Sequence, residues 1–360
     1  MVFVDNENNR AAIYAEPGTL KIEIKDVLKP VPAAGQILVR LTHTGVCHSD
    51  LAICCQSWPI LPFPTTKGQV GGHEGVGEVV GLGPEVSEPK LGSRVGIKWL
   101  ADVCGSCDAC LEGDDNTCSQ QKISGYYTPG TFQKYVVTSA HYATPIPDGV
   151  DSAEAAPILC AGLTVYSGLR KTNASPGQWI VISGAGGGLG HLAVQYAKNV
   201  MGLRVIAIDH GSKRDLVTTC GAEVFLDFTQ FNDAELTDAV KKLTKGGRGV
   251  NAVMVVNAAN KSYEQGLDFL KPLGTLVCIG MPEGAAVPIQ SAYPARITNQ
   301  QFRIVGSAIG NRREAIEALS FVERGLVKCH YKLEKLENLS QVFEDMKSGK
   351  VQARIVIALD

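Results

Sequence analysis

Four cysteines in one short stretch constrain this chain more than any other feature. They follow the spacing Cys104-x2-Cys107-x2-Cys110-x7-Cys118. Four thiolates so close together can complete a tetrahedral shell around one Zn²⁺ and leave no open position, which is typical of a structural site. An iron–sulfur cluster is disfavoured because the last gap is seven residues and Ser119 follows, where a bacterial ferredoxin pattern has proline. The sequence therefore predicts a loop held by a metal ion.

Three further ligand-type residues are spread more widely along the chain. They are Cys47, His73 in the run Gly72-His73-Glu74-Gly75, and Cys160. This trio supplies only three ligands, so a fourth position stays open for water or substrate, as in catalytic zinc sites. As alternatives, His73 could be an ordinary core histidine and Cys160 a buried apolar thiol. However, Gly-Gly-His-Glu-Gly would be an unusual sequence for a core strand. The sequence thus predicts two zinc ions per chain, one structural and one catalytic.

The composition limits the cellular compartments and the kinds of partner that are expected for this chain. Eleven cysteines in 360 residues do not indicate a disulfide scaffold, which is typical of much shorter secreted chains, so we expect reduced thiols in the cytoplasm. Residues 1–7 lack a basic start and an apolar run, so we expect no signal peptide. No run of about 18 apolar residues suggests a membrane span. The net charge of −2, without a basic cluster, argues against nucleic acid.

The chain has two regions that differ in their pattern of apolar residues, glycine and proline. From about residue 20 to 145, short apolar runs alternate with glycine and proline, which favours a β-rich, partly open barrel or sandwich. After Pro157 strands alternate with helices, which predicts a parallel, doubly wound sheet. The expected strands there lie at 179–183, 204–209, 223–227, 252–256 and 275–279. The last 50 residues predict helices near 312–324 and 339–347, and a final strand, 353–358, that returns to the first domain.

A glycine-rich loop lies between the expected strand 179–183 and the expected helix 189–200. It reads Gly184-Ala-Gly186-Gly187-Gly188-Leu189-Gly190. Strict G-x-G-x-x-G spacing is not met, because its third glycine position falls on Leu189. The physical requirement is the same, however: a tight turn, close approach of the backbone to a pyrophosphate, and a helix N-terminus that faces it. The loop therefore predicts a dinucleotide site.

Asp209 bears on which dinucleotide is bound. It ends the next expected strand, 19 residues after Gly190. A carboxylate there accepts hydrogen bonds from the ribose hydroxyls and repels a 2′-phosphate, which favours NAD(H) over NADP(H). Lys213 and Arg214 follow, and these basic side chains could instead bind that phosphate. NADP(H) therefore stays the alternative.

Together these residues resemble the zinc-containing medium-chain alcohol dehydrogenases, of the shorter yeast and fungal type. The resemblance covers nearly the whole chain. Besides the cysteine stretch and the glycine loop, it rests on Gly45-Val-Cys47-His48-Ser49-Asp50, Gly71-Gly-His73-Glu74-Gly75-Val-Gly77, Gly96-Ile-Lys-Trp99, Leu159-Cys160-Ala-Gly-Leu-Thr164-Val-Tyr166, Val305-Gly306-Ser307 and Gly310-Asn311-Arg312. It implies an α/β chain with a GroES-like catalytic domain, 1–162, that contains a zinc lobe, 98–120. A Rossmann cofactor domain, 163–305, follows, and 306–360 returns to the catalytic domain.

The resemblance also implies roles for single residues. Cys47, His73 and Cys160 would bind the catalytic zinc, with Glu74 just behind it, and Asp50 would hold the other nitrogen of His73. Ser49 would contact the reacting oxygen and accept its proton. The cofactor would be bound by residues of the loop, of its flanks and of the C-terminal strand: His48, Thr164, Gly184, Gly187, Gly188, Leu189, Gly190, Asp209, Arg214, Ile279, Met281 and Arg354. Trp58, Trp99 and Met281 would line the substrate pocket.

This sequence departs from the family pattern at two places. A histidine that usually ends the proton relay is replaced by Ala52, and a methyl group cannot carry a proton. We therefore expect Ser49 to pass its proton to the ribose and then to water, or by way of His48. The segment from Trp58 to Val70 is about three residues longer than in the yeast type. We expect it to border the substrate entrance and to admit a substrate that is bulkier or more polar than ethanol.

The predicted activity is hydride transfer between a zinc-bound alcohol or carbonyl compound and NAD(H), in a homo-oligomer that is a tetramer or a dimer. One alternative is an NADPH-dependent carbonyl reductase on the same scaffold. A zinc-free quinone or enoyl reductase is disfavoured because it should lack both cysteine sets. A dinucleotide-binding protein that has lost turnover is the remaining alternative, and Ala52 is its only support.

Overall fold

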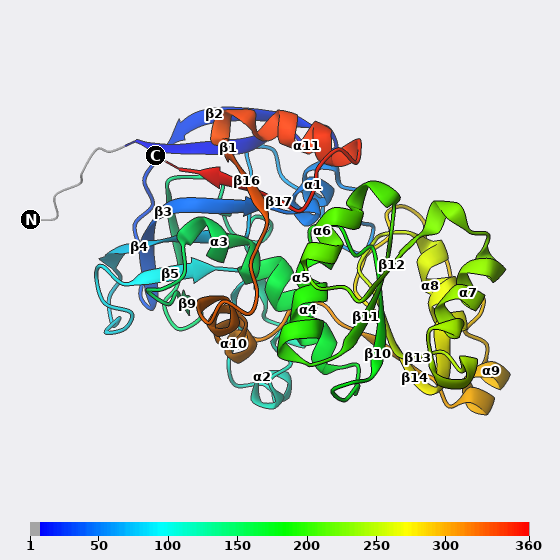
Figure 1. Ribbon diagram of the computed structural model, residues 1–360. Coiled ribbons are helices and arrows are strands. Elements are labelled where there is room, and N and C mark those ends of the chain that lie inside the picture. The colour runs from blue at the N-terminus through cyan, green and yellow to red at the C-terminus, as the bar shows by residue number, and fades with distance from the viewer. Residues whose placement is uncertain (1–7, 360) are drawn as a thin grey trace, which may run out of the picture. The chain divides into compact units, whose positions relative to one another are not determined.

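The computed structural model describes residues 8–359, and these form two compact units (Figure 1). The first unit runs up to Cys160 and continues in Asn311–Glu323 and from Tyr331 onward. The second unit comprises Ala161–Gly310 and Arg324–His330.

The sequence-based boundaries were 162 and 305, with one return segment from 306. The structure instead divides the chain after Cys160 and after Gly310, and it assigns Arg324–His330 to the second unit. Residues 1–7, on which the signal-peptide expectation depends, lie outside the described residues.

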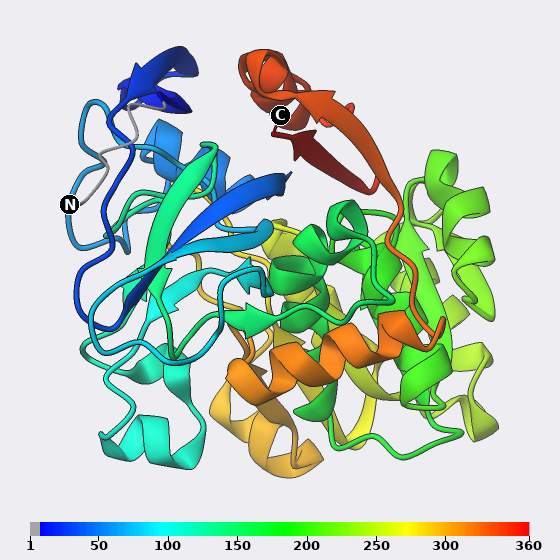
Figure 2. The same cartoon turned by 90° about the vertical axis from the view of Figure 1, so that its left-hand side faces the viewer.

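The first unit is built on a seven-stranded sheet of order β16-β17-β3-β4-β5-β9, with β8 also paired to β3. Its strands are β3 (Gln36–Val46), β4 (Gly75–Leu82), β5 (Arg94–Ile97), β8 (Tyr135–Ser139), β9 (Thr144–Pro145), β16 (Tyr331–Lys335) and β17 (Arg354–Ala358). A hairpin of β1 (Asn9–Glu16) and β2 (Lys21–Val27) forms a separate sheet, dark blue in Figure 2. A second small sheet pairs β6 (Leu100–Asp102) with β7 (Lys122–Ile123).

Strand β3 is the centre of this unit. It pairs with β4, β8 and β17, always antiparallel, and Ile355 lies opposite Val46. The C-terminal strand therefore does return to the first sheet, because the buried run Arg354–Ile357 supplies an apolar partner for β3. Residue 354 is brought in this way next to the segment that carries Cys47.

Five helices belong to the first unit. They are α1 (His48–Cys55), α2 (Asp108–Glu112), α3 (Ser152–Pro157), α10 (Arg312–Glu323) and α11 (Leu339–Lys347). The last two appear where the sequence predicted helices, whereas α1, α2 and α3 were not predicted. Helices α1 and α3 each have an acidic side chain at the N-terminal end that accepts backbone N–H groups: Asp50, the third residue of α1, accepts that of Cys47, and Asp151, directly before α3, accepts those of Ala153 and Glu154. Such local capping is a helix signal that apolar periodicity does not reveal.

The second unit is a six-stranded parallel sheet of order β12-β11-β10-β13-β14-β15. Its strands are β10 (Trp179–Ser183), β11 (Arg204–Asp209), β12 (Val224–Asp227), β13 (Val250–Val255), β14 (Leu270–Cys278) and β15 (Arg303–Gly306). Its helices are α4 (Leu163–Arg170), α5 (Gly190–Gln195), α6 (Arg214–Thr219), α7 (Asp233–Lys242), α8 (Asn260–Phe269) and α9 (Pro294–Gln300). The doubly wound α/β prediction is confirmed. No helix within residues 8–359 is long and apolar enough to cross a membrane.

Candidate metal centres and cofactor site

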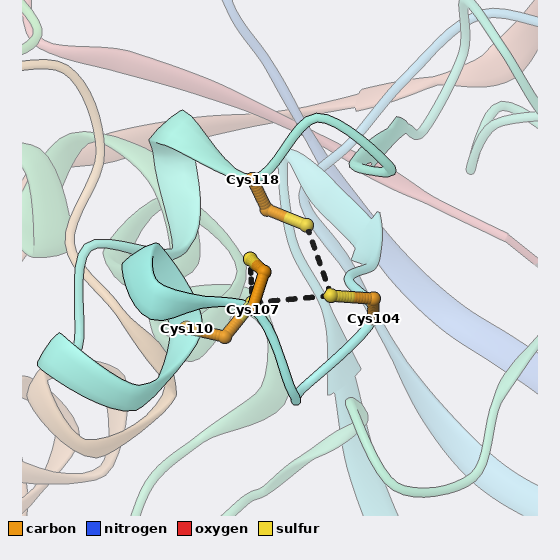
Figure 3. Close-up of side chains that lie close together, drawn as sticks. All are labelled: Cys104, Cys107, Cys110 and Cys118. Carbon is orange, nitrogen blue, oxygen red and sulfur yellow. Dashed lines mark hydrogen bonds between the residues drawn. The ribbon is translucent and has the colours of Figure 1, made fainter.

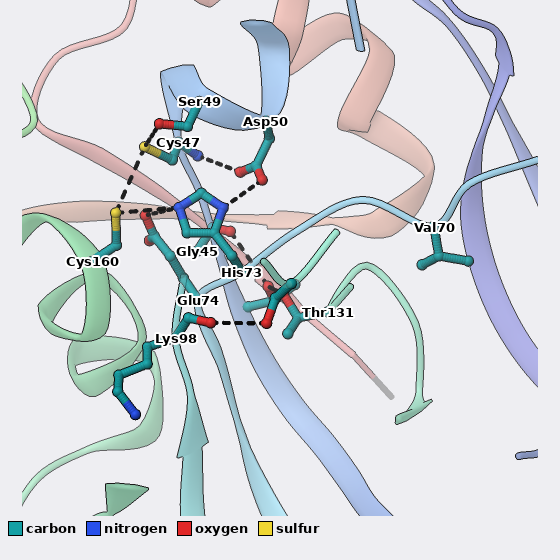
Figure 4. Close-up of polar contacts among 12 residues, drawn as sticks. Gly45, Cys47, Ser49, Asp50, Val70, His73, Glu74, Lys98, Thr131 and Cys160 are labelled. Carbon is teal, nitrogen blue, oxygen red and sulfur yellow. Dashed lines mark hydrogen bonds and ion pairs between the residues drawn. The ribbon is translucent and has the colours of Figure 1, made fainter. Parts of the chain in front are cut away.

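Cys47, His73, Glu74 and Cys160, hereafter the His73 cluster, come together in the first unit, with ligand atoms all within 4.8 Å of one another (Figure 4). Cys47 joins β3 to α1, and His73 and Glu74 directly precede β4. Cys160 lies in a π-helical turn, Ile158–Gly162. All four side chains are buried. Residues far apart in the sequence thus form one compact donor set.

The spacing of these donors fits zinc. The sulfurs of Cys47 and Cys160 are 3.9 Å apart, and Nε2 of His73 is 3.2 Å from the Cys160 sulfur. A tetrahedral zinc with Zn–S bonds of about 2.3 Å and a Zn–N bond of about 2.0 Å needs ligand separations of roughly 3.5 to 3.8 Å. Mixed sulfur and imidazole donors also match the borderline softness of Zn²⁺. The residues present can therefore hold this ion.

Asp50 orients His73. Its Oδ1 lies 2.7 Å from Nδ1 of His73, and its Oδ2 accepts the backbone N–H of Cys47 at 2.9 Å. Burial would lower the pKa of His73, but the buried Asp50 carboxylate outweighs it and raises that pKa well above its usual value. With Nδ1 held by a carboxylate, Nε2 faces the two sulfurs, which is the usual arrangement for a metal-binding histidine.

Glu74, a member of this donor set, forms a buried ion pair with Arg354. Nη2 of Arg354 bonds Oε1 of Glu74, and that same oxygen is 3.9 Å from Nε2 of His73. Burial raises the pKa of Glu74 to about 7, although Arg354 opposes the shift. A side chain at Gly45 would collide with Glu74, since its Cβ would lie 1.9 Å from Oε2. Thus glycine at 45 makes the room for this carboxylate.

Two other predicted residues lie on the same segment. The hydroxyl of Ser49 is 3.6 Å from the Cys47 sulfur, so Ser49 lies at the edge of the donor set. His48 is exposed at the start of α1, whereas Ala52 is completely buried in that helix. The position that the family pattern gives to a relay histidine is here a packed methyl group.

Aromatic side chains flank His73. The Trp99 ring meets the His73 ring edge-on at 4.9 Å, and Trp58 meets Trp99 at 6.5 Å. Trp58 is almost buried, at 9% exposure. Further along the segment from Trp58 to Val70, Phe63 stacks on Tyr126 at 4.6 Å. Both tryptophans predicted for the substrate pocket are therefore connected to the His73 cluster through ring contacts.

The four-cysteine lobe, Cys104 to Cys118, lies between β6 and β7 (Figure 3). Cys104 and Cys118 are 3.6 Å apart, Cys107 and Cys110 are 3.6 Å apart, and Cys104 and Cys110 are 3.9 Å apart, measured between sulfurs. These separations match a tetrahedral ZnS₄ site. Backbone N–H groups of Ser106 and Cys107 lower the pKa of Cys104 to about 6, which favours the thiolate that binds metal.

In the second unit the glycine loop joins β10 to α5. Gly184 has a φ of +87°, and its Cβ would lie 2.9 Å from Asn257. A Cβ at Gly190 would lie 2.0 Å from the carbonyl oxygen of Gly184, whereas at Gly187 the nearest atom is 3.5 Å away. The loop thus packs tightly at Gly184, Gly186 and Gly190, since a Cβ at Gly186 would lie 2.4 Å from Cβ of Lys213, and it leaves space at Gly187, where a pyrophosphate could approach the backbone. Gly188 and Leu189 complete the turn before α5.

Asp209 ends β11 beside this loop. Its Oδ2 accepts the backbone N–H of Gly186 and its Oδ1 that of His210, both at 2.7 Å. The Arg214 guanidinium lies 4.6 Å from the centre of the Phe225 ring, so this cation packs on an aromatic face. Thr164 is nearly buried on α4, Ile279 follows β14, and Met281 is 41% exposed.

The sequence predicted most residues of the site but not the buried partners of its charged side chains. It proposed Arg354 for the cofactor pyrophosphate, and the structure pairs that side chain with Glu74. Lys98 had no predicted role, although its side chain is only 1% exposed. The available signal was a lysine next to a tryptophan directly after the apolar run Val95-Gly96-Ile97. Its partners are distant in sequence and could not be inferred.

Comparisons with known proteins agree with this geometry. Residues 33–148 match the alcohol dehydrogenase GroES-like domain, and residues 188–324 match the zinc-binding dehydrogenase model. The chain is 53% identical to alcohol dehydrogenase 2 of Emericella nidulans over 98% of each chain, and 42% identical to alcohol dehydrogenase of Schizosaccharomyces pombe over 97% of each. Among solved structures, acetophenone reductase from Geotrichum candidum in complex with NAD superimposes with a TM-score of 0.82 and 29% identity, covering 98% of this chain and 97% of that one.

Proposed function

This chain belongs to the zinc-containing medium-chain alcohol dehydrogenases, which interconvert alcohols and carbonyl compounds. We propose that one of its two donor sets has a catalytic role and the other a structural role. Cys47, His73 and Cys160 hold a catalytic zinc, and the four-cysteine lobe holds a structural one. The observation that carries this assignment is the buried His73 cluster, whose donors lie within 4.8 Å and whose histidine is oriented by Asp50.

Each bound group supplies its own chemistry: zinc acts as a Lewis acid toward an alcohol or carbonyl oxygen, and a nicotinamide carries the hydride. The chain's residues supply position and proton transfer. Ser49 lies beside Cys47 and accepts the substrate hydroxyl proton. Since Ala52 is buried and cannot titrate, that proton continues through His48 or water. Arg354 holds Glu74 by an ion pair, which keeps the carboxylate from competing as a permanent fourth ligand.

For the cofactor we propose NAD(H). Asp209 lies at the glycine loop with its carboxylate bonded to the N–H of Gly186, where a 2′-phosphate would meet a negative charge. Of the two cations that could offset this charge, Arg214 packs on Phe225, whereas Lys213 lies against the loop, with its Cβ 2.4 Å from where a Cβ at Gly186 would lie. Lys213 is therefore the side chain that would favour NADP(H). Thr164, Leu189, Ile279 and Met281 would contact the nicotinamide, and Gly184, Gly187, Gly188 and Gly190 the pyrophosphate.

For the substrate we propose an alcohol or carbonyl compound that is bulkier than ethanol. The segment from Trp58 to Val70 is held in place by the Phe63–Tyr126 stack, while Ile60 remains 77% exposed.

We further propose a cytoplasmic homo-oligomer, a tetramer or a dimer. No disulfide joins the eleven cysteines, all of which lie within the described residues, and this is compatible with a reducing compartment and with metal binding. Strand β15 lies at an edge of its sheet that a second copy could cover.

The test combines zinc content with turnover. Metal per chain is measured on the purified protein, and absorbance at 340 nm follows NADH or NADPH against small and bulky carbonyl compounds. We expect two zincs, a preference for NADH, and a higher kcat/KM for bulky substrates. One zinc without turnover would overturn the catalytic assignment. A preference for NADPH would overturn the role of Asp209, and ethanol as the best alcohol would overturn the substrate proposal.

A further inference from the structure

Lys98 places an amine in the interior of the first unit, where it is 1% exposed. Together with Trp99 it forms the two-residue joint between β5 and β6. Figure 4 shows its side chain pointing away from the His73 cluster. Burial of an amine is costly unless it gains compensating contacts, so those contacts indicate what the residue does.

The Lys98 side chain is held by Tyr142. Its Nζ donates to the Tyr142 carbonyl oxygen at 2.7 Å and lies 3.7 Å from the centre of the Tyr142 ring. Burial lowers the pKa of Lys98 to about 7; Asp115 opposes this shift and Arg312 adds to it. Protonated or neutral, the nitrogen can donate this hydrogen bond. Lys98 therefore fixes the joint to the segment that carries Tyr142.

Tyr142 in turn is bonded to the four-cysteine lobe. Its hydroxyl donates to Oδ2 of Asp115 at 2.6 Å, and the same oxygen accepts the backbone N–H of Arg312 at 3.3 Å. Asp115 lies inside the lobe, between its third and fourth cysteines, and is 7% exposed. A single tyrosine thus connects the lobe to Lys98.

The other side of the joint faces the His73 cluster. Ser124 donates its hydroxyl to the Lys98 carbonyl oxygen at 2.8 Å and its backbone N–H to the Trp99 carbonyl oxygen at 2.9 Å. With both carbonyl groups fixed, the Trp99 ring stands edge-on to His73 at 4.9 Å. The position of this ring depends on how the joint is held.

We propose that Lys98 is a positioning residue that fixes Trp99 beside the His73 cluster and that makes this position depend on the four-cysteine lobe through Tyr142 and Asp115. The lobe then has a second task besides stabilising its own loop: it shapes one wall of the substrate site. The inference rests on the proposed function, which gives Trp99 its place in the substrate pocket.

The test uses Trp99 as its own reporter. The sequence has three tryptophans, so Trp58→Phe with Trp179→Phe leaves Trp99 as the single tryptophan, which is excited selectively at 295 nm, beyond the absorption of tyrosine. Tyr142→Phe, which deletes one oxygen, and Lys98→Met are introduced in this background and in the native chain. Thr144→Val is the matched control, because Thr144 is equally buried two residues away and its hydroxyl has no partner within the described residues.

We expect Tyr142→Phe and Lys98→Met each to move the Trp99 emission maximum to longer wavelength and to increase its quenching by acrylamide. For a bulky alcohol KM should rise about tenfold, equivalent to about 1.4 kcal/mol, while kcat changes less than about twofold, since a wall residue affects binding rather than chemistry. The double variant should exceed neither single variant, because both break the same connection. Thr144→Val should change none of these quantities.

Lower thermal stability in Tyr142→Phe with unchanged Trp99 emission and unchanged KM would overturn the proposal, since the network would then only stabilise the fold. If Lys98→Met does not fold, Tyr142→Phe decides alone. Turnover of the native chain is measured in parallel. Its absence would refute the proposed function, whereas the emission of Trp99 would still confirm or refute the connection between the lobe and the joint.

Discussion

The two donor sets of the first unit differ in how the chain builds them. The four-cysteine lobe takes its ligands from 15 consecutive residues, Cys104 to Cys118, and three of the four are only half-buried. The His73 cluster joins residues up to 113 positions apart, and every member is buried. One set forms from local chain geometry, and the other exists only when β3, β4 and the π-helical turn of Cys160 are assembled.

The difference explains why the two sites suit different tasks. A local shell of four thiolates is complete in itself, so bound metal contributes folding free energy to the loop. The His73 cluster has three soft or borderline donors and a carboxylate already engaged by Arg354. Its geometry is imposed by surrounding secondary structure and by Asp50, which is what a catalytic site requires. Substitutions at the ligands and at their outer partners should therefore affect the two sites differently.

Replacing one ligand of the His73 cluster should have the largest effect. Cys160→Ser should lower kcat/KM by about 10³-fold or more, because a Lewis acid supplies several kcal/mol of transition-state stabilisation. Zinc content should fall from two to about one per chain with little loss of fold. Cys220→Ser, a buried thiol outside both sets, is the control and should retain both zincs. Retained turnover in Cys160→Ser would remove Cys160 from the catalytic set.

The matching change in the lobe should act on stability. Cys110→Ser should lower the free energy of unfolding by several kcal/mol, since metal binding there is folding free energy. Chelator titration followed by thermal unfolding measures this loss. In the protein that stays folded, kcat should remain within a few-fold of the native value. Cys278→Ser is a similarly half-buried control. Complete loss of kcat in folded Cys110→Ser would mean that the two sites are not separate.

Removing the charge that orients His73 should be milder than removing a ligand. Asp50→Asn keeps a similar shape but loses the carboxylate bonded to Nδ1. We expect a loss of about 10- to 100-fold in zinc affinity or activity, the usual effect of such outer partners. The lobe zinc should be unaffected. Equal loss of both zincs, measured by competition with a chromogenic chelator, would contradict this role.

Removing the Lys98 amine should leave both donor sets intact and change how stability depends on pH. Its pKa is about 7 in the folded protein against 10.5 for an ordinary lysine, so between these values the unfolded chain binds more protons. Stability should therefore rise with pH in this window, by up to about 1.4 kcal/mol per pH unit relative to Lys98→Met, and the difference should be flat below about pH 7. Urea unfolding from pH 6 to 9 measures it. A difference that does not change with pH would show that Lys98 has an ordinary pKa.

Local sequence was sufficient for several features. The spacing of the four cysteines, the glycine loop between strand and helix, and strands such as Trp179–Ser183 and Arg204–Asp209 all appear in the structure where the sequence predicted them. Each depends on residues that are near one another in the chain. The fold class and the zinc dehydrogenase family follow from such motifs, and the comparisons confirm both.

Tertiary structure decided the rest. Helices α1 and α3 are exceptions, because their capping residues Asp50 and Asp151 are local in the sequence, but apolar periodicity alone does not reveal them. The ion pair of Glu74 with Arg354 joins residues 280 positions apart, and Lys98 meets Tyr142 and Asp115 only after the sheet and the lobe have formed. Sequence alone determined which donors and which loop this protein has. Which partner each buried charge takes was decided by packing, because a buried charge must be satisfied by whatever the assembled fold brings within reach.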